Sequence, residues 1–390
     1  MVQKRSSKKI ISQPSLLEEA SICLNCGLCR DGCVMFRYLG FDPRLTPVLR
    51  LFRSSQLKDM AHVDVGNSLS YSDDLLNNLY LCTTCAYCKE VCPYELDMPA
   101  MIEKARYELR ESGLKSRKIF EDKLSQIIKE ENPYNELRRN RTVWLNKLDF
   151  KPPEKADLMF FVGCTPSYRT QEIAIATAKI LHKAGITFGV LGKEACCGSV
   201  LIRTGFPEQA KLQAKKNLEL FKGVKELIIA CAGCYRAFKK DYPALGFKLP
   251  FKVTHTTEYL VDLIKKNKLK LGPINMKVTY HDPCHIARDC GIYEPPRDIL
   301  NAIPGLELLE FYPTKNASYC CGAGGGVKMA FPEPATSIAY DKIDLALKMG
   351  VDAIVTACPF CLHNLRDAAK DTELKVYDIE EILLESLDNA

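Results

Sequence analysis

Beyond residue 156, short apolar runs alternate with longer segments in which apolar and polar positions follow helical spacing. Two of the helical segments cover residues 170–184 and 208–222, and further helices are expected after Cys234 and Cys361. The apolar runs have the length of buried strands. They occupy residues 157–163, 186–191, 226–230, 277–281 and 351–356. Strands that alternate with helices in this way predict parallel β/α units.

The first part of the chain has helical patterns instead. Helices are expected over residues 13–22, 72–81 and 98–112, and Ser72 or Asp73 would serve as the N-cap of the second. The predicted fold class is therefore α+β and multidomain, with an all-helical N-terminal domain followed by α/β domains.

A charged segment separates these two parts. Residues 113–155 are rich in Lys, Glu and Arg and end near the sequence KPPEK, so we expect a solvated helical connector with a Pro-Pro break. The predicted boundaries are 1–112 for the helical domain, 113–155 for the connector, and 156–272 and 273–390 for two α/β domains.

Composition narrows the class of protein. The 390 residues are 47% hydrophobic, which is ordinary for a soluble chain. The net charge of +6 comes from scattered Lys and Arg, so we expect no nucleic-acid partner. No apolar stretch is long enough to span a bilayer, and the basic start MVQKRSSKK is followed by no apolar leader. We therefore expect a cytoplasmic protein that reaches a membrane only through a partner subunit.

Cysteine changes this picture most. Eighteen of the 19 cysteines fall into four sets. Two sets are Cys-x2-Cys-x2-Cys-x3-Cys runs that begin at Cys23 and Cys82, and two larger sets begin at Cys164 and Cys284. Each larger set combines a single cysteine, a Cys-Cys-Gly and a Cys-x-x-Cys. In a long chain without a leader, this pattern favours metal binding over a disulfide framework.

The two tight runs predict a ferredoxin-like pair of cubane 4Fe–4S clusters. In such runs three cysteines hold one cluster and the fourth reaches the neighbouring cluster. The expected ligands are Cys23, Cys26, Cys29 and Cys92 for one cubane, and Cys82, Cys85, Cys88 and Cys33 for the other. Structural zinc is the alternative for Cys-x2-Cys pairs, but a doubled four-cysteine run favours iron. The expected role of this domain is electron relay.

The two larger sets are copies of one another. Cys284 follows Cys164 by 120 residues, Cys320 follows Cys196 by 124, and Cys358 follows Cys231 by 127. A nearly constant offset indicates a tandem duplication. The duplicated α/β domains should pack with pseudo-two-fold symmetry, so that their cysteine sets face each other across a shared cleft. The cysteines follow predicted strands and precede predicted helices, where anionic ligands gather in α/β folds.

Both larger sets match the CCG-domain pattern. A double-cluster unit followed by two such repeats resembles the D-subunit family of heterodisulfide reductases over essentially the whole chain. The resemblance implies non-cubane 4Fe–4S clusters that reduce the mixed disulfide of coenzyme M and coenzyme B in one-electron steps. Their ligands would be Cys164, Cys196, Cys197, Cys231 and Cys234 in the first repeat, and Cys284, Cys320, Cys321, Cys358 and Cys361 in the second.

The resemblance also implies partners. It predicts an electron-donor or electron-acceptor subunit, either a membrane cytochrome b or a flavoprotein, and a small disulfide or thiol substrate. The chain has no flavin or nicotinamide motif, so electrons should enter from the partner through the ferredoxin-like domain. The same architecture resembles iron–sulfur subunits of flavin-dependent glycolate, lactate and glycerol-3-phosphate dehydrogenases, which is the alternative function. Zinc in one CCG site stays open as well.

Four features lie near the second larger set. His285 follows Cys284 and is the candidate catalytic residue; it would protonate a leaving thiolate, or hydrogen-bond to cluster sulfur. His281 is expected to be structural, and Cys290 is expected to be a free buried cysteine. The glycine-rich run at 322–326 predicts a close backbone approach to cluster or substrate.

Overall fold

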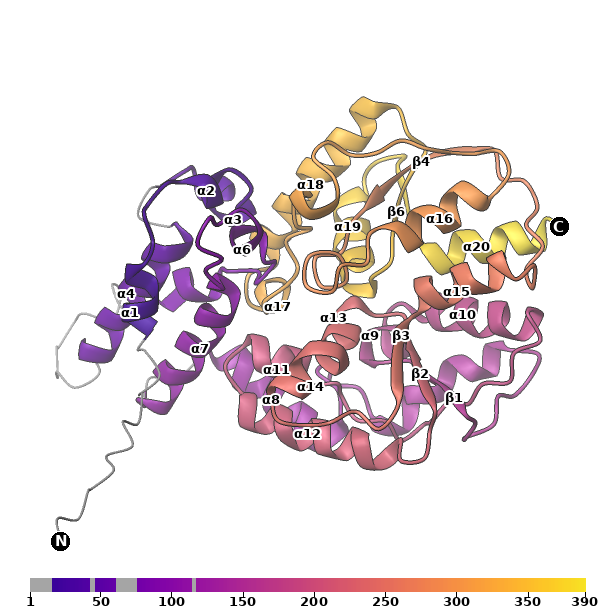
Figure 1. Cartoon of the computed structure of the whole chain (residues 1–390), viewed down its shortest axis with the longest axis horizontal. Coiled ribbons are helices and arrows are strands. Elements are labelled where there is room, and N and C mark those ends of the chain that lie inside the picture. Colours follow the sequence, from indigo (N-terminus) through magenta and orange to yellow (C-terminus); the bar gives the residue numbers. More distant parts are fainter. Residues whose placement is uncertain (1–15, 43–45, 61–75, 114–116) are drawn as a thin grey trace, which may run out of the picture.

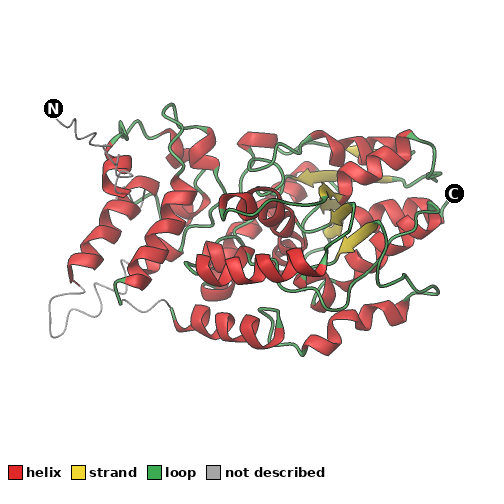
Figure 2. Ribbon diagram, turned by 60° about the horizontal axis from the view of Figure 1, so that its bottom comes forward, coloured by secondary structure: helices red, strands yellow, loops and turns green. Residues whose placement is uncertain are grey.

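The computed structural model describes residues 16–42, 46–60, 76–113 and 117–390. A helical N-terminal unit lies beside two α/β units that are stacked on one another (Figure 1). Figure 2 shows the few strands surrounded by helices. This is the α+β multidomain class predicted from the sequence.

The N-terminal unit is built from helices around two cysteine-bearing loops. Its core forms where α1 (Leu16–Ser21) and α4 (Pro47–Met60) pack against α7 (Met98–Glu111). Its other helices are α2 (Leu28–Asp31), α3 (Val34–Tyr38), a helix over 76–80 and α6 (Tyr87–Glu90). The N-cap expected at Ser72 or Asp73 lies outside the described residues.

Helix α7 begins where the sequence predicts. The carboxylate of Asp97 accepts a hydrogen bond from the amide of Ala100 at 3.1 Å, and Pro99 occupies the first turn, where its missing N–H costs no hydrogen bond.

The charged segment is not the solvated connector that its composition predicts. It forms α8 (Lys118–Glu130) and the 3-10 helix η2 (Arg138–Lys147), and η2 buries Arg141 and Trp144. Trp144 packs edge-on against Phe160 of the first strand, with ring centroids 6.5 Å apart. The helical part of the prediction is confirmed, but the expectation of a solvated segment is wrong, because one face of η2 packs on the first α/β unit.

The first α/β unit has a three-stranded parallel sheet in the order β1-β2-β3. The strands are β1 (Leu158–Phe161), β2 (Glu226–Ile229) and β3 (Lys252–His255). The covering elements are α9 (Cys164–Tyr168), α10 (Gln171–Lys183), α11 (Ser199–Arg203), α12 (Pro207–Leu220), α13 (Ala232–Arg236), η3 (Ala237–Asp241), α14 (Tyr242–Ala244) and α15 (Thr256–Lys265).

The strand predicted at 186–191 is wrong. Only Gly189 pairs with β1, through hydrogen bonds with Leu158 and Phe160, and the next residue, Val190, bonds to Pro153 instead. A side chain at Gly189 would place its Cβ 2.4 Å from the sulfur of Met159, so this contact requires glycine. The chain leaves the sheet after one residue pair.

The second α/β unit has a four-stranded parallel sheet in the order β5-β4-β6-β7. Its strands are β4 (Met276–His281), β5 (Leu306–Leu308), β6 (Ala353–Thr356) and β7 (Lys375–Asp378). Its helices are α16 (Glu294–Ala302), η4 (Lys315–Ala317), α17 (Val327–Ala330), α18 (Pro332–Met349), α19 (Pro359–Ala369) and α20 (Ile379–Asp388). The order β4-β6-β7 repeats β1-β2-β3, as expected for a duplication. Helices α10 and α15 of the first unit pack against α20 and α16 of the second.

Candidate metal centres

The eight ferredoxin-like cysteines line two small cavities in the N-terminal unit. Cys23, Cys26, Cys29 and Cys92, with Cys88 at the border, line the outer one, and Cys33, Cys82, Cys85 and Cys88 line the inner one. We call these the outer and inner sites. Cys26 is exposed to solvent, so the outer site lies at the surface.

Left-handed backbone shapes both sites. Asn25 and Thr84, at equivalent places in the two runs, both have φ 53°, and Ala86 has φ 63°. These conformations are unfavourable for residues other than glycine. They turn the amides of Asn25 and Thr84 toward the sulfurs of Cys23 and Cys82, each at 3.4 Å. The strained loops therefore supply N–H groups to sulfur, as sulfur ligands of a cluster require.

The ten cysteines of the larger sets are all buried and line one cavity of about 120 Å³ between the two α/β units. Cys164 lies three residues after the carboxyl end of β1, and Cys231 and Cys358 lie two residues after the ends of β2 and β6. All three stand at the starts of helices. Parallel strands put their carboxyl ends at one edge of a sheet, which is why cysteines distant in sequence converge there.

The two larger sets meet inside this cavity. The thiols of Cys231 and Cys358, one from each repeat, lie within hydrogen-bond reach of each other. Within the second repeat, the sulfurs of Cys321 and Cys361 are 3.4 Å apart. The amides of Gly198 and Gly322 donate to the sulfurs of Cys196 and Cys320 at 3.5 and 3.4 Å. Free sulfur donors with backbone N–H partners fit iron–sulfur clusters.

His285 lies in the same cavity. Its Nδ1 would lie 3.6 Å from a Cβ on Gly233, and its Nε2 is buried without a hydrogen-bond partner. Burial, and then Arg236 and Arg203, hold the pKa of His285 well below its usual range, so the ring is neutral at pH 7.

His281, the last residue of β4, is also buried at the second cysteine set. One of its ring nitrogens and the sulfurs of Cys321 and Cys361 all lie within 4.8 Å of one another. Neither of its ring nitrogens has a hydrogen-bond partner. The ring therefore lies beside two of the candidate ligands, and the structural role expected for it stays a prediction.

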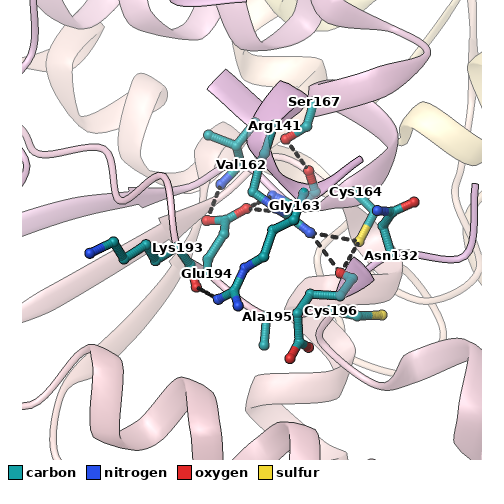
Figure 3. Close-up of polar contacts among 12 residues, drawn as sticks. Asn132, Arg141, Val162, Gly163, Cys164, Ser167, Lys193, Glu194, Ala195 and Cys196 are labelled. Atoms are coloured by element: carbon teal, nitrogen blue, oxygen red, sulfur yellow. Dashed lines mark hydrogen bonds and ion pairs between the residues drawn. The ribbon is translucent and has the colours of Figure 1, made fainter. Parts of the chain in front are cut away.

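A buried ion pair lies beside the first set. Arg141 of η2 donates to Glu194 at 3.0 Å and lies 3.5 Å from the sulfur of Cys164 (Figure 3). Glu194 also accepts from the amides of Gly163 and Val162, at 2.7 and 3.2 Å. Burial lowers the pKa of Arg141, but Cys164 and Glu194 more than offset this and raise it. Burial raises the pKa of Glu194, while Arg141 and the two amides act in the opposite direction. The ion pair at 3.0 Å and the two amide donors favour the carboxylate, so the charge of Arg141 is compensated by its partner.

The inner site touches the second repeat. The thiol of Cys85 lies within hydrogen-bond reach of the thiol of Cys320. The glycine-rich run packs on the same loop: a Cβ on Gly325 would lie 2.2 Å from the carbonyl oxygen of Cys82. The close approach predicted for this run is therefore made to the backbone of the inner site. Arg106 joins the units by donating to the carbonyls of Cys82 and Gly325 at 2.9 and 3.0 Å.

Comparison with known proteins agrees with these features. A 4Fe–4S dicluster domain model matches residues 19–96, and a cysteine-rich CCG domain model matches residues 158–239 and 278–366. The chain is 38% identical over 392 residues to the D subunit of dihydromethanophenazine:CoB–CoM heterodisulfide reductase from Methanosarcina barkeri, covering 95% of each chain. The chain belongs to the D-subunit family of heterodisulfide reductases.

Other relatives share parts of this architecture. The chain is 37% identical to the B subunit of fumarate reductase (CoM/CoB) from Methanothermobacter marburgensis, over 78% of this chain and 61% of that one. It is 30% identical to EtfAB:quinone oxidoreductase of Syntrophomonas wolfei, over 94% and 58%. A crystal structure of a hypothetical protein from Helicobacter pylori matches with a TM-score of 0.60 at 12% identity, over 88% and 68%, and supports the fold alone.

As a member of this family with these domains, the chain binds iron–sulfur clusters. Cys290, outside the four sets, is only partly buried and lies outside the shared cavity. None of the helices in the described ranges has the length and apolar character that a bilayer-spanning segment requires.

Sequence reasoning missed several residues at these centres. Arg141, Glu194, Arg288 and Lys342 all lie at the larger sets, and all are buried. The one available signal concerns Lys342, which occupies the buried face of α18 with Ile338 and Ala346, four residues away on either side.

Proposed function

We propose that the chain is the iron–sulfur catalytic subunit of a heterodisulfide reductase-type complex, which reduces a disulfide such as that of coenzyme M and coenzyme B to two thiols. The observation that carries this proposal is the shared cavity. Each repeat contributes all five of its cysteines to this cavity, and the two sets meet at Cys231 and Cys358. A pure relay has no need of two complete facing sets.

Four clusters are proposed. The outer and inner sites would hold cubane 4Fe–4S clusters, and the two larger sets would each hold a non-cubane 4Fe–4S cluster. When bound, the pair in the cavity would supply two one-electron reductants, which matches the two electrons that a disulfide accepts. The balance is one disulfide, two electrons and two protons to two thiols.

The order of the sites suits electron entry from a partner subunit. Exposed Cys26 puts the outer site where a donor can approach, and Cys85 brings the inner site against the second repeat. We propose a membrane cytochrome b or a flavoprotein as this partner.

The cavity would shelter the disulfide from water, because its lining is mostly apolar apart from cysteine sulfur. Arg203 is its one charged lining residue among those described, and Glu103 and Asp241 pair with it at 2.8 and 2.5 Å. His285 would hold the proton for a leaving thiolate. Its ring is neutral at rest, but a thiolate formed beside it would raise its pKa, so that the ring could take up a proton from solvent and pass it to the thiolate.

The test is metal content and activity of protein purified without oxygen. We expect about 16 iron per chain and reduction of the coenzyme M–coenzyme B disulfide by a reduced viologen dye. Cys361→Ser should lose most of this activity. Cys290→Ser is the matched control, because Cys290 belongs to none of the four sets, and it should keep both iron and activity.

A relay subunit would give a different result. Full iron content with reducible clusters but no disulfide consumption would favour the alternative, an electron-transfer subunit of a flavin-dependent dehydrogenase. About 12 iron with one zinc would leave one site of the pair inactive and would contradict the proposed pairwise reduction.

A further inference from the structure

The cavity holds two cysteine sites, one from each repeat. We call the five cysteines from Cys164 to Cys234 the first site and the five from Cys284 to Cys361 the second site. The residues around these two sites differ at equivalent positions of the repeats. The last residue of β4 is His281, and its equivalent at the end of β1, 120 residues earlier, is Phe161. The same offset relates Arg288 to Tyr168. Helices α18 and α12 begin 125 residues apart, which relates buried Lys342 to buried Asn217. At these three positions the second repeat has a histidine, an arginine and a lysine, whereas the first repeat has no basic side chain.

Arg288, from the second repeat, lies between the inner site and the cysteines of the second site. Its Nε donates to the carbonyl of Cys85 at 2.7 Å, and its Nη1 donates to the carbonyl of Ser318 at 2.6 Å. Its Nη2 is buried without a partner. Burial lowers the pKa of Arg288, but the thiolates of Cys85, Cys284 and Cys320 more than offset this and raise it. Nothing in the described ranges pairs it with a carboxylate within 4.0 Å.

Lys342 reaches the second set from the opposite side, on α18. Its Nζ lies 4.9 Å from the centroid of the Phe311 ring, and it lines a small cavity together with Cys320. Burial lowers its pKa, and the thiolates of Cys321 and Cys320, followed by the carboxylate of Asp282, only partly offset this. In the part of the chain that the structure describes, no carboxylate forms an ion pair with it.

The first set has a buried cation too, but that cation is neutralised. Arg141, near Cys164, is paired with Glu194 at 3.0 Å, as Figure 3 shows. The residue equivalent to Glu194 in the second repeat is Ser318, whose offset from it is that of the Cys-Cys pairs. The first site therefore has an ion-paired cation nearby, whereas the second has the imidazole of His281 and two cations that form no ion pair in the described ranges, with Asp289 and Asp282 acting on them from farther away.

Net charge and hydrogen bonds to sulfur are the main protein controls on the potential of an iron–sulfur cluster. A buried positive charge stabilises the added electron, and the low dielectric of the interior strengthens the effect. We propose that Arg288 and Lys342 make the second site the higher-potential member of the pair, so that it accepts the electron from the inner site first. One electron leaves the inner site, which is oxidised, and enters the second site, which is reduced. This rests on the proposed function, since it requires clusters at both sites.

The test is a redox titration followed by electron paramagnetic resonance, with Cys234→Ser and Cys361→Ser used to assign the signals of the two cavity sites. In the unmodified chain, the second-site signal should appear at the higher potential. In Lys342→Met, the ratio of reduced to oxidised second site at a fixed potential should fall about tenfold, which is 59 mV for one electron. Lys342→Arg should restore it.

Two further variants complete the test. Arg288→Gln should lower the potentials of both the inner and the second site, because Arg288 touches both. The double variant Arg141→Gln/Glu194→Gln is the matched control: it removes a neutral pair and should leave the second-site signal in place.

The proposal is overturned if Lys342→Met keeps its iron and no potential moves, or if the first-site signal appears at the higher potential. If Arg288→Gln fails to fold, Lys342→Met still decides. Iron analysis separates this from the proposed function, since a second site without iron in the unmodified chain would refute that function directly.

Discussion

The two α/β repeats have the same strand order and the same cysteine spacing, yet the side chains around their cysteines differ. Strands β1-β2-β3 and β4-β6-β7 correspond, and so do the left-handed glycines after the Cys-Cys pairs, Gly198 and Gly322, with φ 80° and 91°. Around this shared frame the first repeat places a compensated ion pair and the second places unpaired cations. The backbone and the ligands are fixed by what a cluster needs, whereas the charge around them is free to diverge.

The largest expected effect concerns the ion pair of the first repeat. Arg141→Met would leave Glu194 charged and buried without its partner, so the free energy of unfolding should fall by about 3–5 kcal/mol. Urea unfolding followed by circular dichroism measures this. The double variant Arg141→Met/Glu194→Gln removes the charge on both sides and should recover most of the loss.

Arg169→Met is the matched surface control. Arg169 pairs with Glu136 at 2.7 Å, but both side chains are about one-third exposed, 35% and 33%. Its removal should cost less than about 1 kcal/mol. Equal losses at Arg141 and Arg169 would mean that the buried pair does not distinguish the first repeat.

The next effect concerns the loop after each Cys-Cys pair. The residue equivalent to Gly325 in the first repeat is Leu201, and Gly325 packs on the backbone of the inner site. Gly325 has φ 64° and no room for a Cβ beside Cys82. Gly325→Ala should therefore cost more than the roughly 1–2 kcal/mol of the left-handed conformation alone, because its Cβ also clashes with Cys82. It should also slow electron transfer from the inner site to the cavity.

Gly350→Ala provides the control for strain without contact. Gly350 has nearly the same φ, 66°, but a Cβ there meets nothing within 4 Å. It should lose only about 1–2 kcal/mol, the cost of the left-handed conformation alone, and leave electron transfer unchanged. If the two variants behave alike in stopped-flow reduction and in urea, the close approach at Gly325 has no special role.

The cysteine sets and the alternation of strands and helices could be predicted because both are local patterns. Strands β1, β2 and β6 follow from mainly apolar runs, LMFF, ELII and AIVT, and the mixed sequence of β4 is predicted because the repeat places a strand before Cys284. Strands β3 and β7 are missed because KVTH and KVYD are short and mix polar with apolar residues, so their place in the sheet depends on neighbouring strands.

The charged residues at the sites could not be predicted for a different reason. Lys and Arg are ordinarily solvated, so Arg141 in a charged segment and Arg288 near a cysteine read as surface residues. Their burial results from packing between segments far apart in sequence, such as η2 on β1 and the N-terminal unit on the second repeat. Neither contact leaves a local signal.

The smallest effect concerns the helix caps of the two repeats, which have opposite dependence on pH. His255 caps α15 through Nδ1, which accepts from the amide of Thr257 at 3.3 Å, and its equivalent Asp378 caps α20. Burial lowers the pKa of His255 from 6.5 to about 3. The unfolded chain therefore binds one more proton between these values, and stability should fall as the pH drops, by about 1.4 kcal/mol between pH 7.5 and 5.5.

Asp378 behaves in the opposite sense. Burial and then Glu380 raise the pKa of its carboxyl, so its contribution is present at low pH and is lost as the pH rises through that raised pKa. Urea midpoints at pH 7.5, 6.5 and 5.5 test both caps. Relative to the unmodified chain, His255→Asn should gain stability toward pH 5.5, because asparagine caps the helix without titrating, and Asp378→Asn should gain in the opposite direction, as the pH rises. Parallel pH profiles for the two variants would show that the repeats do not differ at their caps, and the electrostatic divergence would then be confined to the cysteine sites.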